Sequence, residues 1–199
     1  VDSLKGQDLT IAGGVGNIMS SNNEGGYIHT ELTGSIDANA DGTISFESIN
    51  GDLKILAAAA GKDLNLKAAG DILMQNVAGS EAQGRINAAE VNLTAGGSIG
   101  GAGEDQAIRI LDNGAVVNAD AVDGIWLSGE SGEESTGNLV IGSIKGESID
   151  LTSVSDVRLG RESTEEDERL TGSITTTNGD ASISAVNVDL ADGSVQTGE

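Results

Sequence analysis

Residues 37–48, DANADGTISFES, carry oxygen-bearing side chains at the spacing of a calcium-binding EF-hand loop. Positions one, three and five of such a loop are filled by Asp37, Asn39 and Asp41. An EF-hand loop ends in a Glu whose two carboxylate oxygens both bind the ion, and Ser48 stands there instead. Calcium binding is therefore the first chemistry that the sequence raises.

The sequence on either side of this stretch favours a different interpretation. An EF-hand loop joins two helices, whereas HTELTGSI before it and INGDLKIL after it have the composition of strands. Asp and Asn also favour tight turns. We therefore predict a turn at the corner of a β-coil, then a strand in which Ile44 and Phe46 point inward, with a calcium site as the alternative. The outward side chains of that strand would be Thr43, Ser45 and Glu47.

His29 and Tyr27, in NNEGGYIHTE, are further candidates for chemistry. A single His in a chain without Cys cannot build a zinc site. No Ser-His-Asp arrangement is visible around it. From these residues we assign no catalytic, cofactor-binding or metal-binding side chain.

Two surface features have both a structural and a binding interpretation. Trp126 lies between Ile125 and Leu127, so we expect it to point outward, either covered by the insertion GESGEESTG or exposed as an anchor for a partner. The acidic run RESTEEDER, residues 161–169, is expected to be a solvated loop leaving a corner between coils. A receptor-binding or protease-exposed segment is the alternative for that run.

Charge and composition narrow the classes of partner. The chain has 199 residues, with 32 acidic and ten basic ones, and a formal net charge of −22. Nucleic acids and anionic lipids are bound by Lys and Arg, so we expect no nucleic-acid binding and no membrane insertion. Phe, Trp and Tyr occur once each, which leaves the core to Ile, Leu, Val and Ala. Small, uniform core residues suit a narrow interior built from many similar layers.

Apolar residues recur in pairs at spacing two, which is typical of strands with one buried face. The residues flanking or separating these pairs are expected to face water; they are Thr10, Lys54, Asn65, Asn92, Arg109, Asn138 and Asp150. A helix in ILAAAAGKDLNLKAAGD is the alternative at one place, but Gly61 interrupts it and Leu64 and Leu66 alternate. The pairs are Leu9/Ile11, Ile44/Phe46, Leu53/Ile55, Leu64/Leu66, Val91/Leu93, Ile108/Ile110, Ile125/Leu127, Leu139/Ile141, Ile149/Leu151, Val157/Leu159 and Val188/Leu190.

Repetition of short phrases decides between a sandwich and a solenoid. GDLKILAAA, GKDLNLKAA, AAEVNLTAG, KGESIDLTS and SAVNVDLAD resemble one another, and Gly-(Ser/Asp)-Ile returns five times, at 34, 70, 97, 142 and 172. Recurrence of one short unit indicates stacked coils, each of which buries its apolar face on its neighbours. We predict an all-β parallel β-helix over 1–199, with about 8–10 coils at ~4.8 Å per stacked strand, or ~40–50 Å of rod.

Residues 93–160 resemble the repeat region of filamentous haemagglutinin-like proteins. The motifs GSIG, AIRI, GIWL, GNLVIGSI and SIDLTS follow in the order of that family's repeats. The resemblance implies a right-handed β-helical fibre segment of a bacterial surface adhesin, exported by two-partner secretion through an outer-membrane transporter. The family's secretion domain carries Asn-Pro-Asn motifs and this chain has no Pro, so the resemblance implies a piece of the shaft, without catalytic residues.

The function expected from this resemblance is adhesion to a receptor, protein or glycan, on a host cell or bacterium, with the chain secreted or at the cell surface. Parallel β-helices also include polysaccharide lyases and glycosidases. Three aromatic and ten basic residues are few for a cleft that cleaves an anionic polymer, so we do not expect an enzyme. A passive spacer that projects a distal tip is the third hypothesis.

Overall fold

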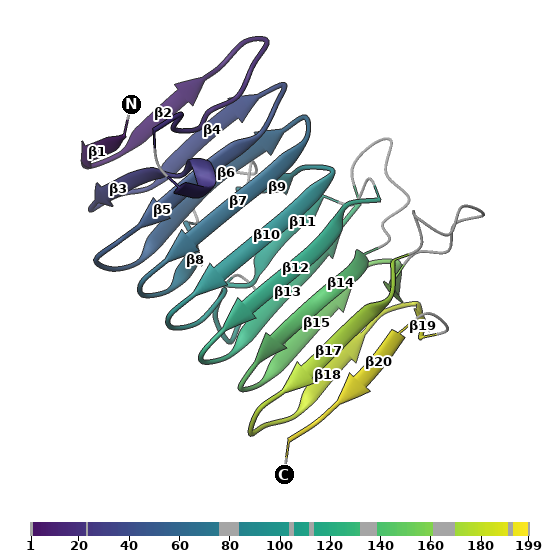
Figure 1. The fold of residues 1–199 in the computed structure, drawn as a ribbon. Coiled ribbons are helices and arrows are strands. Elements are labelled where there is room, and N and C mark those ends of the chain that lie inside the picture. Colours follow the sequence, from purple (N-terminus) through teal and green to yellow (C-terminus); the bar gives the residue numbers. More distant parts are fainter. Residues whose placement is uncertain are drawn as a thin grey trace.

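The computed structural model describes residues 2–22, 24–75, 84–103, 106–111, 114–131, 139–160, 170–190 and 193–198. The strands stack from the N-terminal end to the C-terminal end of an elongated molecule, and the two termini lie at opposite ends (Figure 1). All strand pairs are parallel. The predicted all-β parallel β-helix is confirmed.

Two parallel sheets form the walls of the solenoid. Sheet A contains β1 (Ser3–Gly6), β3 (Ile28–Leu32), β5 (Ile44–Ser48), β7 (Asp63–Ala68), β10 (Glu90–Ala95), β12 (Val116–Ala121), β14 (Leu139–Gly146), β16 (Asp156–Leu159), β17 (Gly172–Thr176), β19 (Asn187–Asp189) and β20 (Gly193–Gln196). Sheet B contains β2 (Leu9–Ala12), β4 (Ile36–Ala40), β6 (Leu53–Ala60), β8 (Ile72–Met74), β9 (Ile86–Asn87), β11 (Ile108–Leu111), β13 (Ile125–Glu130), β15 (Ile149–Ser153) and β18 (Ala181–Ser184).

Each coil contributes one strand level, here called a rung, to each sheet. Among the described residues, nine strands follow one another in the main order of sheet A. Eight spacings of ~4.8 Å make the stack ~40 Å long, within the predicted range. The only helical turn in the described part is η1 (Glu24–Gly26), and no helix there is long and apolar enough to cross a membrane.

The core consists of columns of aliphatic side chains that meet their equivalents on the next rung. Leu64 pairs with Val91, and Val91 pairs with Val117. Ala68, Ala95 and Ala121 form a second column at the end of sheet A, where small side chains let the chain turn toward sheet B. The segment considered for a helix forms strands β6 and β7 instead.

The last predicted inward pair, Val188 and Leu190, is not part of the core. These side chains are 43% and 46% exposed, because β19 pairs with β16 and no described strand covers its other edge. The alternation of apolar residues predicted the spacing of Val188 and Leu190 correctly. Burial of their side chains also requires a further rung stacked on β19.

Some rungs are interrupted in the middle rather than at a corner. β14 is continuous, and its two halves pair separately with β16 and β17. The acidic run 161–169 lies outside the described residues, but its flanks show where it is inserted. A Cβ atom on Gly172 would lie against the backbone nitrogen of Gly160, so the two flanks are adjacent within one rung. The flanking strands β16 and β17 thus belong to one rung of sheet A and do not meet at a corner between coils, whereas the solvated loop expected for the run itself stays a prediction.

Candidate functional site

Strand β4 contains the first half of the EF-hand-like stretch. Asp37 and Asn39 point outward from it, while Ala38 and Ala40 are buried. Only Asp41 and Gly42 form the turn before β5, so the predicted turn was placed too early. Alternation of Ile36 with alanines makes this segment a strand, and an extended strand does not have the conformation of an EF-hand loop. Among the described residues, no three acidic or His side chains gather at a potential metal site.

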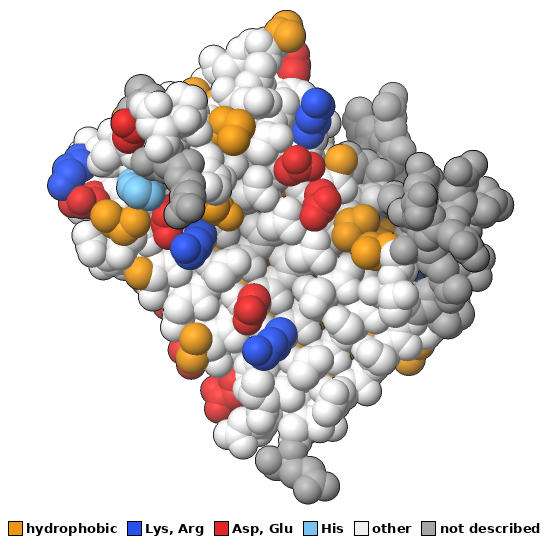
Figure 2. Space-filling view, in the orientation of Figure 1, with side chains coloured by type: hydrophobic (Ala, Val, Ile, Leu, Met, Phe, Trp, Pro, Cys, Tyr) orange, Lys and Arg blue, Asp and Glu red, His pale blue; other side chains and the backbone are white. Residues whose placement is uncertain are grey.

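His29 belongs to a row of ionisable side chains on the outer face of sheet A, with Glu47 and Lys67. Its Nε2 lies 3.2 Å from Oε2 of Glu47, and Oε1 of Glu47 lies 2.9 Å from Nζ of Lys67. Hydrogen bonding and attraction to Glu47 raise the pKa of Lys67 above 10.5. Figure 2 shows this face, with the single His beside acidic and basic side chains near the N-terminal end. These contacts link the rungs of β3, β5 and β7.

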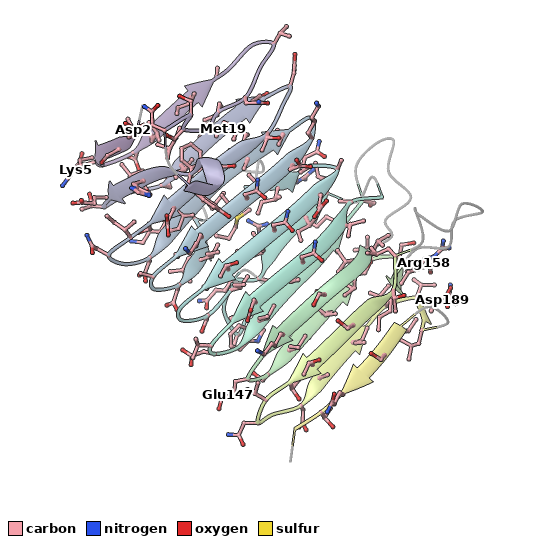
Figure 3. The ribbon with its side chains drawn as sticks, viewed as in Figure 1. Asp2, Lys5, Met19, Glu147, Arg158 and Asp189 are labelled. Carbon is pink, nitrogen blue, oxygen red and sulfur yellow. The ribbon has the colours of Figure 1, made fainter. Side chains whose placement is uncertain are left out.

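The charged rows continue at both ends of the molecule. Lys5 binds Glu31 at 2.7 Å near the N-terminus, and Arg158 lies beside Asp189 on neighbouring strands near the C-terminus (Figure 3). Ser20 donates a hydrogen bond to Asp2, which lowers the pKa of that carboxyl group. These contacts join successive coils.

The middle of the same face carries a line of hydrogen-bonded residues, here called the asparagine ladder: the side chains of Ser45, Asn65, Asn92 and Asn118, and the backbone N–H of Ser143, which donates to Oδ1 of Asn118. Asn118 donates to Asn92 at 2.9 Å, Asn92 to Asn65 at 3.0 Å, and Asn65 to Ser45 at 3.1 Å. Ser45, Asn65 and Asn92 face outward as expected, although Ser45 is fully buried by its neighbours. Instead of binding only water, they bind one another.

A second set of contacts occurs at three of the five Gly-(Ser/Asp)-Ile phrases, those at 34, 70 and 97. Oδ1 of Asp71 accepts a hydrogen bond from the backbone N–H of Ser98 at 2.6 Å. A Cβ atom on Gly97 would collide with the same carboxylate oxygen, so a larger residue there would have to displace the Asp71 carboxylate. Asp8 and Asp52 act in the same way on the next rung at Gly34 and Gly70.

Arg109 corrects the expectation that every residue between an inward pair faces water. Its side chain is only 3% exposed. Nε donates to the carbonyl of Gly84 at 3.1 Å and lies 3.8 Å from Oε1 of Glu130. Arg85 also contacts Glu130, at 3.2 Å. The backbone of Gly84, on the preceding rung, and the Glu130 carboxylate thus hold this arginine, and alternation within one strand cannot reveal contacts of this kind.

Trp126 points outward from sheet B, as predicted, and forms one wall of a groove of about 500 Å³. This Trp126 groove is lined by Gly103, Ala107, Trp126, Leu127, Ser128, Asp150 and Thr152. Strand β13 supplies the tryptophan and the serine, and β15 supplies the aspartate and the threonine. Gly103 and Ala107, from the segment between Ile99 and β11, complete the lining.

The groove combines an aromatic surface, one carboxylate and two hydroxyl groups. Asp150 lies beside Trp126, and Thr152 lies beside Ser128, because β13 and β15 are neighbours in parallel register. Sequence analysis found Trp126 but did not connect it with Asp150. The signal was available in the repeat, since aligning GIWLSG with SIDLTS places tryptophan over aspartate and serine over threonine.

Comparisons with known proteins do not identify the chain. No protein-family model matches it, and no curated protein and no solved structure shows significant similarity to it.

Proposed function

We propose that the chain is a shaft segment of a secreted bacterial surface adhesin fibre, which mediates or projects cell adhesion. The observation that supports this most is the continuous rung-on-rung pairing of both sheets along the whole stack. Such a stack is held by contacts between neighbouring coils and suits an extended, load-bearing rod. The resemblance of residues 93–160 to filamentous haemagglutinin-like repeats supports the same function.

The distribution of chemistry also favours binding over catalysis. Aliphatic side chains fill the interior, and the asparagine ladder, the charged rows and the Trp126 groove all lie on outer faces. Asp150 is the only carboxylate among the described residues that line this groove, whereas glycoside hydrolysis ordinarily uses two. The partners in this proposal are a surface receptor and, for export of the parent protein, an outer-membrane transporter.

Adhesion can be tested with the purified chain coupled to microspheres. Spheres are passed over layers of host cells and of bacteria under flow, and the retained fraction is counted. Spheres carrying an unrelated protein of similar negative net charge are the control. Retention above this control on at least one surface is expected. Retention equal to the control on every surface would contradict the adhesive role and favour the passive spacer, and release of sugars from polysaccharide would favour an enzyme.

A further inference from the structure

We propose that the Trp126 groove binds one uncharged pyranose ring of a surface glycan. This inference rests on the proposed function, since a fibre outside the cell meets such glycans. A pyranose presents an apolar face of C–H groups and an edge of hydroxyl groups. Its binding site therefore needs an aromatic surface together with hydrogen-bonding oxygen atoms, and the groove contains both.

The register of the sheet sets the spacing of the four side chains. Trp126 and Asp150 are one strand spacing apart, ~4.8 Å, and Ser128 and Thr152 repeat that spacing two residues along, ~6.7 Å away. The Cα atoms of these four residues thus stand at the corners of a rectangle whose size is comparable to one sugar ring, and the indole ring extends from its corner toward Gly124. Because the rectangle is built on paired strands, it is held by backbone hydrogen bonds.

Gly124 positions the indole ring. A Cβ atom at this residue would collide with the benzene part of the Trp126 side chain, so the ring lies against the glycine backbone. The ring is therefore packed against the sheet on this side while it lines the groove on another. An aromatic surface fixed in this way loses little conformational entropy when a ligand stacks on it.

The polar groups of the groove are mainly acceptors for sugar hydroxyl groups. The Asp150 carboxylate has two acceptor oxygens, and carboxylates form stronger hydrogen bonds than neutral groups do. Thr152 donates its own hydroxyl hydrogen to the carbonyl of Leu127 at 3.4 Å, which leaves its oxygen as an acceptor. Ser128 adds a hydroxyl that can donate or accept.

The charge of the groove selects against acidic sugars. No Lys or Arg is among its described lining residues, and Asp150 would repel a carboxylate or sulfate group. The nearest arginine along the register is Arg109, beside Ser128, and it already bonds to Gly84 and lies next to Glu130. The volume of about 500 Å³ lies within the range of small-molecule sites and leaves space for the glycan to continue past the bound ring.

Tryptophan fluorescence gives a direct readout, because Trp126 is the only tryptophan. Neutral oligosaccharides ending in glucose, galactose, mannose or N-acetylglucosamine are titrated into the full chain, with sialylated and sulfated oligosaccharides in parallel. A saturable change in emission with at least one neutral oligosaccharide is expected, and none with the acidic ones. Saturation by no neutral oligosaccharide, or preference for acidic ones, would overturn the proposal.

Two variants test the residues. D150N should weaken binding at least tenfold with the melting temperature unchanged, and S182A is the matched control, since Ser182 faces outward beside Asp150 on the next strand. W126A should abolish binding on a glycan array, where fluorescence is not needed, and W126F should restore part of it. Equal binding by D150N and the wild type would refute the site.

The outcomes also separate this inference from the proposed function. If microspheres coated with D150N are retained on cells as well as wild-type spheres, the groove is not the adhesive site although the adhesive role stands. If the wild type binds neutral glycans but its spheres are not retained on any surface, the groove proposal stands and the adhesive role fails.

Discussion

At the scale of single residues, the outer face of sheet A is stabilised by side chains that bond across rungs. Asn92 occupies the centre of the asparagine ladder, because it donates to Asn65 and accepts from Asn118. A hydrogen bond contributes a net ~0.5–1.5 kcal/mol, and partly buried partners that lose it must find water instead. Stacked parallel rungs thus give polar surface residues a structural role.

Substitution of Asn92 measures this role. N92A should lower the free energy of unfolding by ~1–2 kcal/mol, because two hydrogen bonds are lost. N39A is the matched control, since Asn39 is an exposed outward residue of β4, and it should change stability by less than ~0.5 kcal/mol. Both are measured by urea denaturation, and equal effects would show that the ladder contributes nothing.

The contact between Gly97 and Asp71 permits a second test, with a double-mutant cycle. G97A should cost ~1–2 kcal/mol, because the new methyl group displaces the Asp71 carboxylate from the N–H of Ser98. In the D71A background the same change should cost little, since no carboxylate remains to be displaced. G51A is the control, because a Cβ atom there meets no atom within 4 Å. Additive effects of the two substitutions would contradict this explanation.

At the scale of elements, alternation of large apolar residues predicted the strands with two large inward residues. It missed strands whose inward positions are mostly alanine, such as β4, because alanine is small, only weakly hydrophobic and favours helices more than strands. Sequence repetition likewise grouped all five Gly-(Ser/Asp)-Ile phrases as if they occupied equivalent positions in each coil. Those at 34, 70 and 97 lead into sheet B, whereas Gly142 lies within β14 and Gly172 begins β17 in sheet A.

The candidate site was predictable only in part, because local sequence patterns show which way a side chain points but not which strand lies beside it. The outward direction of Trp126 follows from its neighbours, but its pairing with Asp150 depends on which rungs are adjacent. Insertions make the number of residues per coil vary, so a short motif does not determine register by itself. Arg109 shows the same limit, because its burial depends on chain from an earlier rung.

Core packing can be tested at two positions that alternation treats alike. L93A should lower the free energy of unfolding by ~2–5 kcal/mol, since Leu93 is 2% exposed and a cavity would remain. L190A should cost less than ~1 kcal/mol, because nearly half of that side chain is already in water. Similar losses measured by urea denaturation would mean that the last rung is covered after all.

The interruption between β16 and β17 predicts tolerance to a deletion. Removing residues 162–168 should change the melting temperature by only a few degrees, because the flanking Gly160 and Gly172 are adjacent and loop entropy varies slowly with length. Removing 149–156 instead takes out β15 and should destabilise the rungs on both sides. If circular dichroism showed that the variant without residues 162–168 is unfolded, the acidic run would itself be structural.

At the scale of the whole molecule, the central claim is that the chain forms one continuous stack of parallel rungs. The adhesive role requires an extended rod, and the Trp126 groove exists only if neighbouring strands keep their parallel register. In a parallel stack, the distance between two residues of one column depends on the number of rungs between them and not on their separation in the sequence. Five successive rung steps connect one outward column of sheet A: Lys67, Thr94, Asp120, Lys145, Thr175 and Gln196.

Spin-label distances test this claim directly, because the chain has no cysteine and labels can be attached at introduced ones. In double electron–electron resonance, K67C paired with T175C should give ~19 Å, for four rung steps, and K67C paired with Q196C should give ~24 Å, for five. The difference of one rung spacing is expected even though the attachment arms broaden each distance. Distances that do not increase by this step, or that are far longer than five rungs allow, would contradict a single parallel stack.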